Sequence, residues 1–158
     1  SLNFSWYEKK MKRVIEHLKQ TMPNTAIVVI SIADKSTKYD TTMQTDSAVA
    51  PLVYSQLKYA KEAEVGFVNL FELMGGAGTM IKWTEEEPAK SNKDYTHLNF
   101  RGAKIVSDLI FKKIISGYNQ FKSQKKTIKK EPNTNKILDT LPKPKPKQQP
   151  INLTNNAN

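Results

Sequence analysis

The feature that most constrains the fold of this chain is an unbroken apolar run, Ala26–Ile32, that directly follows a helical pattern. Apolar residues recur at helical spacing over about 6–21, after a Ser5–Glu8 pattern typical of a capping box, and Pro23 closes the stretch. The run itself is rich in β-branched residues and does not alternate apolar with polar positions, which is typical of a strand covered on both faces. Such strands belong to parallel sheets, so the sequence predicts an α/β protein.

The remaining segments continue the alternation of helix and strand. The sequence predicts a polar, aperiodic connection over 34–50, a second helix opening at Pro51 and a second strand over Val65–Leu70. A long loop with a short helix is predicted over 74–93. A third helix follows, which Asn99 caps, in which Gly102 permits close packing, and which fades near Tyr118. This order is that of a doubly wound α/β fold cut short. Two strands are too few for a stable parallel sheet, and the chain opens on Ser1 rather than Met, so we expect it to be truncated at its N-terminus.

Composition divides the chain near residue 121. The stretch 119–158 holds nine lysines against two acidic residues, so it carries +7 of the formal net charge of +10. It also holds five of the eight prolines and no Trp or Tyr, and such a stretch buries too little apolar surface to order itself. The sequence therefore predicts a folded domain over 1–121 and a disordered Lys/Pro-rich tail over 122–158. Because the domain itself is nearly balanced in charge, nucleic acid is a disfavoured partner.

Residue counts exclude or disfavour several classes of site and location. The chain has no cysteine, which excludes disulfides and thiolate metal sites, and two histidines are too few for a three-histidine zinc site. We therefore expect neither a metal nor a cofactor. No run approaches the roughly 18 apolar residues that a membrane span needs, and these residues do not open on a charged-then-apolar signal segment.

The most specific local signal is an Asp three residues before a His, in the segment Lys93-Asp94-Tyr95-Thr96-His97-Leu98-Asn99-Phe100-Arg101-Gly102. In a Ser-His-Asp system a carboxylate accepts the imidazole Nδ1 proton and fixes the tautomer, while Nε2 faces the serine hydroxyl as general base. Asp94 and His97 can meet the first requirement within one short loop. The alternative is that Asp94 only makes a turn and that His97 is a surface residue before the helix.

With its context, this motif resembles the last sequence block of the SGNH/GDSL hydrolases, in which D-x-x-H precedes an Asn, a Gly in the first helical turn and an apolar helix. Met74–Trp83 and Val29–Ser36 look like the corresponding segments of bacterial envelope members, including those similar to peptidoglycan and xylan O-acetylesterases, so the resemblance covers about residues 1–118. It implies a flavodoxin-like three-layer α/β/α fold, an extracytoplasmic location and hydrolysis of a carbohydrate ester through an acyl-enzyme. Asp94 and His97 are the only catalytic residues of the family that map here. In the family, the nucleophilic Ser and the Gly and Asn of the oxyanion hole lie upstream of the first helix of this chain.

Serines within the chain are weaker candidates for the nucleophile. Ser47 precedes a helix and stands in the right order relative to Asp94 and His97, but no apolar strand leads into it, as a nucleophile turn requires. Ser31 and Ser36 follow a strand but lack the turn and the helix, so we expect their hydroxyls to satisfy loop backbone.

Other conspicuous residues are assigned to structure rather than to chemistry. His17 is interpreted as a helix-face residue, and Glu85–Glu87 as a solvated run of charge. The cluster Gly75–Gly78 lacks the Gly-Lys-Ser/Thr ending of a phosphate loop. Trp83 and Met80 either line an acyl or sugar pocket or pack a loop onto the domain, and packing is the favoured interpretation.

Two functions from different classes remain open. The first is an SGNH-type carbohydrate esterase whose Asp and His lie in this chain, which is inactive without the serine-bearing part. The second is a non-catalytic binding module with a basic tail. That tail would bind an anionic cell-wall polysaccharide at a bacterial surface or nucleic acid in a cytoplasm, unless it is only a solubilising terminus.

Overall fold

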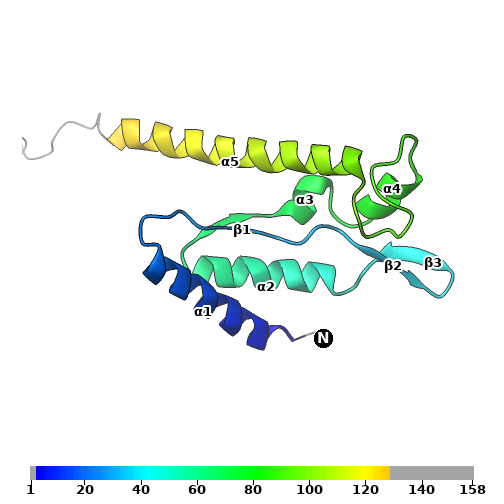
Figure 1. The fold of residues 1–158 in the computed structure, drawn as a ribbon, viewed down its shortest axis with the longest axis horizontal. Helices are drawn as coiled ribbons and strands as arrows, with labels where there is room; N and C mark the ends of the chain where they lie inside the picture. The colour runs from blue at the N-terminus through cyan, green and yellow to red at the C-terminus, as the bar shows by residue number, and fades with distance from the viewer. Residues whose placement is uncertain (1–2, 129–158) are drawn as a thin grey trace, which may run out of the picture. The chain divides into compact units, whose positions relative to one another are not determined.

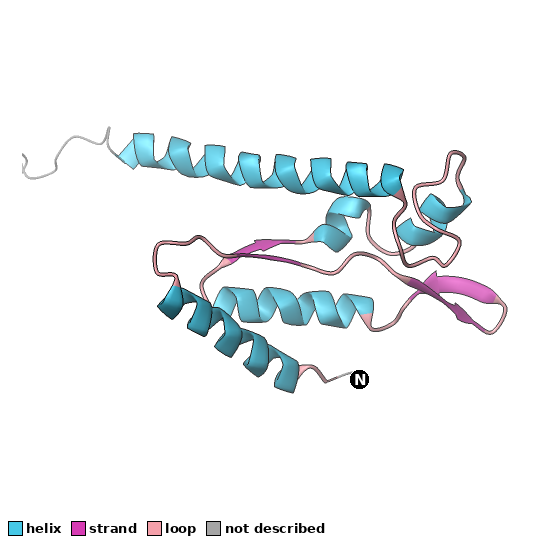
Figure 2. Ribbon diagram, viewed as in Figure 1, coloured by secondary structure: helices cyan, strands magenta, loops and turns pink. Residues whose placement is uncertain are grey.

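The structure is a computed structural model that describes residues 3–128 (Figures 1 and 2). Its elements are α1 (Ser5–Thr21), β1 (Val28–Ile30), β2 (Ser36–Tyr39), β3 (Thr42–Thr45), α2 (Val49–Glu62), β4 (Gly66–Val68), α3 (Leu70–Met74), α4 (Thr79–Glu85) and α5 (Phe100–Ile128). The chain divides into two units, Ser1–Phe121 and Lys122–Asn158, and the first contains all of these strands.

The two predicted strands form a parallel pair. In their register Val28 lies opposite Gly66, Val29 opposite Phe67 and Ile30 opposite Val68. The prediction of an α/β protein with a parallel sheet is therefore confirmed. Each strand is shorter than the apolar run that predicted it, because only the middle of each run pairs with its neighbour.

One face of the strand pair is covered by α1 and α2 (Figure 1). The core on this side consists of Ile15, Tyr59, Ala60 and Ala63, against which Val29 and Phe67 of the strands pack. The two helices are also joined by polar contacts of Glu8, whose carboxylate lies 2.6 Å from Lys58 Nζ and accepts a hydrogen bond from Ser55 Oγ at 2.8 Å. These contacts fix α1 on α2 and thereby complete the first helical layer.

A second core is formed by the elements that follow β4. Its buried members are Leu70, Met74, Met80, Trp83 and Val106, which come from α3, α4 and α5. Figure 1 shows these helices on the side of the strand pair opposite α1 and α2. The three-layer α/β/α arrangement is therefore confirmed, and the packing interpretation of Trp83 and Met80 is confirmed with it.

The segment between β1 and α2 differs from its prediction. The sequence predicts an aperiodic connection over 34–50, but β2 and β3 form an antiparallel hairpin there. Asp40, in the two-residue turn between them, adopts a left-handed φ of 51°. The strands escaped prediction because they are polar and largely exposed, so they lack the apolar alternation that marks a half-buried strand. Their threonines and Tyr39, which are residue types enriched in strands, were the only signal of these strands in the sequence.

Two helix boundaries also differ from their predictions. The helix α1 begins at Ser5 with Phe4 at the N-cap and no side-chain cap, so the predicted capping box is wrong. Instead Ser5 N donates to Asn3 Oδ1 at 2.9 Å. The helix α5 does not fade near Tyr118 but continues to Ile128, so the predicted disorder is wrong for 122–128. Lys and Gln, which dominate its last turns, are good helix formers even without an apolar stripe.

The rest of the predicted tail, 129–158, lies outside the described residues, and its disorder stays a prediction. Within residues 3–128 no helix has both the length and the apolar character needed to cross a membrane.

The second edge of β1 has no strand partner within residues 3–128. The side chains of Val28 and Ile30 on this strand are 45% and 41% exposed, although the strand lies between two helical layers. An open edge with apolar side chains is a template for pairing with another chain.

We therefore expect this chain to self-associate in solution. Ile30→Lys should increase the monomeric fraction, because a charge at the edge opposes strand pairing. The matched control is Val14→Lys, which places the same charge at a 49% exposed apolar residue on α1. Light scattering of the three proteins at one concentration measures the effect. A monodisperse wild-type monomer, or equal effects of both substitutions, contradicts the expectation.

Candidate active site

The Asp-x-x-His motif lies on a tight hairpin between α4 and α5, the His97 hairpin (Ser91–Leu98). Its two end residues form an antiparallel bridge, and Asn92 N donates to His97 O at 2.8 Å. At its tip Tyr95 has a left-handed φ of 56°, and its carbonyl accepts a hydrogen bond from Ser36 N of β2 at 3.0 Å. The hairpin is thus closed at its base and tied to β2 near its tip.

Buried hydroxyl groups fix the base of this hairpin to α4. Thr84 Oγ1 donates to Met80 O at 2.7 Å and lies 2.6 Å from Ser91 Oγ. Ser91 Oγ also lies 3.4 Å from Met80 O, so both hydroxyls are grouped around one carbonyl. Thr84 and Ser91 are both buried, so bulk water does not compete for the hydrogen bonds of their hydroxyl groups.

The far end of the hairpin is fixed by the start of α5. Asn99 Oδ1 accepts hydrogen bonds from Arg101 N and Gly102 N at 2.9 and 3.1 Å, which confirms the predicted cap. Asn99 Nδ2 also donates to Ala89 O at 2.8 Å. Gly102 lies against the backbone, where an added Cβ would be 2.0 Å from Lys90 O. The predicted close packing at Gly102 is therefore confirmed, and it joins the two stems of the hairpin.

Asp94 and His97 meet in the predicted geometry. His97 Nδ1 lies 2.7 Å from Asp94 Oδ2, and Asp94 Oδ1 accepts the backbone amides of Thr96 and His97, each at 3.0 Å. Asp94 therefore makes the turn and also orients the imidazole. An ionised carboxylate only accepts, so Nδ1 carries the proton and Nε2 the lone pair in the neutral ring. The imidazole is 74% exposed, and no group within residues 3–128 hydrogen-bonds Nε2.

The environment of Asp94 favours its ionised form. The backbone amide of His97, then its imidazole and the amide of Thr96, lower the pKa of Asp94 to about 2. An unfolded chain titrates this group near about 3.9. Since the folded pKa is the lower one, the contact stabilises the fold above about pH 4, and that contribution is lost as the pH falls through about 2.

A carbon NMR titration of the Asp94 carboxyl group tests this contact. We expect a midpoint near about 2 in the wild-type protein. His97→Ala should raise the midpoint but leave it below about 3.9, because the two backbone amides still donate. A midpoint unchanged by His97→Ala would show that the imidazole does not contribute.

A pocket of about 320 Å³ lies beside the His97 hairpin at the carboxyl end of β1. Ile32, Ala33, Ala48, Val49 and Leu52 give it apolar walls, and Thr96, the neighbour of His97, belongs to its lining. Lys35 and Asp46 also line it and form an ion pair at 3.4 Å. Ligands of open α/β sheets bind outside the carboxyl ends of the strands, which is the position of this pocket.

Asp34, which also lines this pocket, is a residue that the sequence analysis missed. It is 1% exposed, and its two carboxyl oxygens accept from Thr45 Oγ1 and Met80 N, each at 2.9 Å. It thus joins the end of β1 to β3 and to the first turn of α4. The only signal in the sequence was a carboxyl group placed two residues after the apolar run 26–32.

None of the serines considered as nucleophile bonds to His97 within residues 3–128. Ser47 Oγ accepts from Tyr39 OH at 3.2 Å. Ser31 Oγ accepts from the backbone amide of Phe71 at 3.3 Å, which confirms its expected backbone role. For Ser36 that expectation is wrong, because its buried Oγ has no hydrogen-bond partner within the described part of the chain.

The residues assigned to structure are placed as follows. His17 is exposed on α1, as predicted. Glu86 departs from the predicted solvated run, because its carboxylate pairs with Lys90 Nζ at 2.5 Å. Gly75, Gly76 and Gly78 have φ of 122°, 78° and 81° and make the turn between α3 and α4. Residues 3–128 contain no cluster of three or more His, Asp or Glu side chains that could hold a metal ion.

Comparison with known proteins gives matches of structure. No protein-family model and no curated protein matches the sequence. A solved structure of a peptidoglycan O-acetylesterase superposes with a TM-score of 0.66 at 15% identity, over 76% of this chain and 34% of its own. The esterase domain of the ORF1 protein of the zebrafish ZfL2-1 retrotransposon superposes with a TM-score of 0.50 at 20% identity, over 73% of this chain and 61% of its own.

Both neighbours are SGNH-type hydrolases. The chain has an SGNH hydrolase-like fold. Identities of 15% and 20% establish the fold alone. This SGNH-like chain spans about a third of the first neighbour, and 61% of the second.

Proposed function

We propose that this SGNH-like chain supplies the general base of a serine esterase and the acid that orients it, His97 and Asp94. The observation that carries the proposal is the 2.7 Å contact between Asp94 Oδ2 and His97 Nδ1 on an exposed hairpin. The pocket at the carboxyl end of β1 lies beside that hairpin. The fold likeness to two esterases supports the same reaction class.

In this proposal His97 moves one proton in each half-reaction. As a serine oxygen attacks the ester carbonyl carbon, its proton passes to His97 Nε2, and the carbonyl oxygen becomes an oxyanion. Collapse breaks the bond to the alkoxide, which takes the proton from the imidazolium and leaves. Water then attacks the acyl-enzyme by the same exchange and releases the acid. Asp94 stabilises the imidazolium in both steps and stays ionised.

The attacking serine is proposed to lie outside positions 1–158. Ser31 and Ser47 are engaged with other groups, and Ser36 is buried. The open edge of β1 is compatible with further strands that would bring such a serine to the carboxyl ends of the sheet.

The proposed substrate is an O-acyl ester of a carbohydrate. The apolar walls of the pocket suit a short acyl group, while Lys35, Asp46 and Thr96 can hydrogen-bond ring hydroxyls. The description of the first structural neighbour as a peptidoglycan O-acetylesterase supports this choice. An extracytoplasmic location, with the basic tail near an acidic wall polymer, belongs to the same proposal.

Hydrolysis of p-nitrophenyl acetate tests the assignment in two forms of the protein. For the present chain we expect wild type and His97→Ala to give equal rates, because a base without nucleophile and oxyanion hole has little to act on. In a longer form that contains the serine, His97→Ala or Asp94→Asn should lower kcat by about 10³–10⁴. His17→Ala is the matched control and should change neither rate.

Two results would overturn parts of this assignment. Rapid His97-dependent turnover by the present chain would place the nucleophile inside it and favour Ser47. A longer form that contains the serine yet hydrolyses no ester would favour the non-catalytic binding module.

A further inference from the structure

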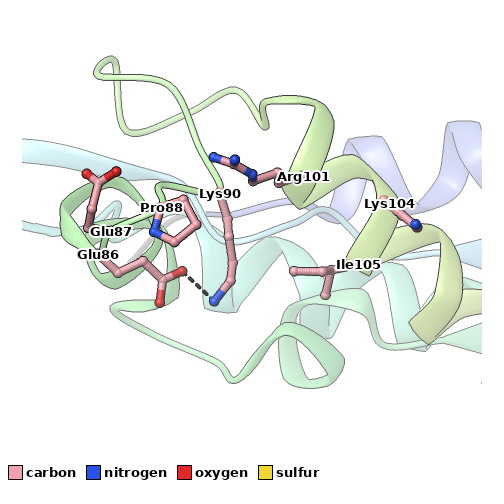
Figure 3. A pocket seen from close by; sticks show the side chains of 7 residues that line it. All are labelled: Glu86, Glu87, Pro88, Lys90, Arg101, Lys104 and Ile105. Carbon is pink, nitrogen blue, oxygen red and sulfur yellow. Dashed lines mark ion pairs between the residues drawn. The ribbon is translucent and has the colours of Figure 1, made fainter.

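A second hollow lies at the root of the His97 hairpin (Figure 3). Its volume is about 320 Å³, and its walls are the segment 86–90, which precedes the hairpin, and the first turns of α5, which follow it. It shares no lining residue with the pocket at the carboxyl end of β1. We call it the Arg101 pocket.

Some of the charged side chains that line the Arg101 pocket form an ion pair, and others do not. Glu86 and Lys90 neutralise each other at 2.5 Å, and this ion pair is the dashed line in Figure 3. The side chains of Arg101, Lys104 and Glu87 take part in no ion pair within residues 3–128, so two cations stand against one acid among the unpaired charges. Because like charges three positions apart on a helix repel each other, a bound anion would relieve a small destabilisation here.

An anion bound in this pocket would contact side chains rather than the backbone amides at the start of α5. At the start of α5, the backbone amides of Arg101 and Gly102 already donate hydrogen bonds to Asn99 Oδ1. Figure 3 shows Arg101 extending from α5 toward the Pro88 side of the hollow, while Ile105 points into it. A cationic side chain and two apolar side chains, Pro88 and Ile105, thus line one hollow.

We propose that the Arg101 pocket binds an organic monocarboxylate, whose carboxylate pairs with Arg101 and whose alkyl group packs on Pro88 and Ile105. The planar guanidinium matches a carboxylate and holds it by paired hydrogen bonds. Three cationic and two acidic residues line the hollow, so its net charge of +1 suits a monoanion better than a phosphate dianion. The apolar surface beside Arg101 favours an alkyl-bearing anion over a fully hydrated one.

The walls of the pocket are also the stems of the His97 hairpin. Asn99 N donates to Lys90 O at 3.2 Å, and Gly102 lies directly against that carbonyl. A ligand that bridges segment 86–90 and α5 would hold together the two stems that carry His97. The pocket is thus a binding site beside the proposed catalytic pair, built from residues that the proposed reaction does not use.

The test is an NMR titration of the full 158-residue chain with sodium butyrate at constant ionic strength. We expect saturating shifts of the Arg101 side-chain Nε–H and of the backbone amides of Lys104 and Ile105. Butylammonium, which has the same alkyl group and the opposite charge, should not bind, and inorganic phosphate should bind more weakly than butyrate. Arg101→Gln should weaken butyrate binding at least about tenfold, since it removes a charge-assisted bond.

The matched control is Lys112→Gln, which removes an equal charge from an exposed position further along α5 and should leave butyrate binding unchanged. Arg101→Lys retains the charge but lacks the paired donors of the planar guanidinium, so it should bind butyrate with intermediate affinity. This variant tests the proposal even if Arg101→Gln fails to fold. Butyrate binding should persist in His97→Ala, so it stands apart from the proposed reaction. Equal binding of butylammonium, or no loss in Arg101→Gln, would overturn the proposal.

Discussion

Replacing Gly102 by alanine is expected to lower the free energy of unfolding by about 3 kcal/mol, the upper end of the usual cost of overpacking. An added Cβ would lie 2.0 Å from Lys90 O and 3.2 Å from Leu98 Cδ2. A side chain could rotate away, but a main-chain carbonyl can move only if α5 or segment 86–90 moves with it. Urea denaturation followed by circular dichroism measures the change.

Gly117 of the same helix provides the matched control. A Cβ there would meet nothing within 4 Å. Alanine is the better helix former by about 0.5–1 kcal/mol, so Gly117→Ala should raise the free energy of unfolding. Opposite signs from the same substitution in one helix would separate close contact from helix propensity. Equal stabilities of the two variants would mean that α5 does not lie against Lys90.

The Gly102 variant should also disturb the candidate site. Any shift of α5 against segment 86–90 separates the stems of the His97 hairpin, so the contact between Asp94 and His97 should loosen. The midpoint of the Asp94 titration should then rise above about 2, as in His97→Ala.

Asp34→Ala is expected to lower the free energy of unfolding by about 3 kcal/mol, because it leaves buried donors without their acceptor. The Met80 amide would lose its partner inside the protein, and the Thr45 hydroxyl would lose the carboxyl oxygen to which it donates. α4 has no side-chain cap from its own N-cap residue, Gly78, and Asp34 supplies the side-chain acceptor for the Met80 amide in its first turn. The variant should lose structure in α4 and in the β2–β3 hairpin together.

Two further variants isolate the cause of this loss. Asp34→Asn keeps one acceptor oxygen and the size of the side chain, so it should cost less than Asp34→Ala. Asp108→Ala removes a carboxyl group from an exposed position on α5, where a change of roughly 0.5 kcal/mol or less is expected. If Asp34→Ala unfolds no more easily than Asp108→Ala, then Asp34 does not join β1 to α4.

Local patterns were enough to predict the parts of the molecule that depend on neighbours in sequence. The contact between Asp94 and His97 was predictable because both residues belong to one turn, whose geometry their spacing nearly fixes. The parallel strands were predictable from their unbroken apolar runs, which are typical of a parallel sheet, although Val28 and Ile30 on one face of β1 stay 45% and 41% exposed. The Asn99 cap and the close approach at Gly102 followed from the same local rules.

The sequence by itself thus determined the α/β class, the two parallel strands and the Asp-His pair. Only the tertiary structure decided how α4, to which the base of the His97 hairpin is bonded, is held to β1 and β3, because those contacts join residues far apart in the chain. Asp34 and Met80 are 46 positions apart, and Thr45 and Gly78 are 33 positions apart. The hydrophobic periodicity of the sequence does not indicate such partners, because a buried polar group comes within hydrogen-bond distance of its partner only after the layers have packed. The Arg101 pocket also depends on tertiary structure, because the hairpin between segment 86–90 and α5 must fold before its two walls face each other.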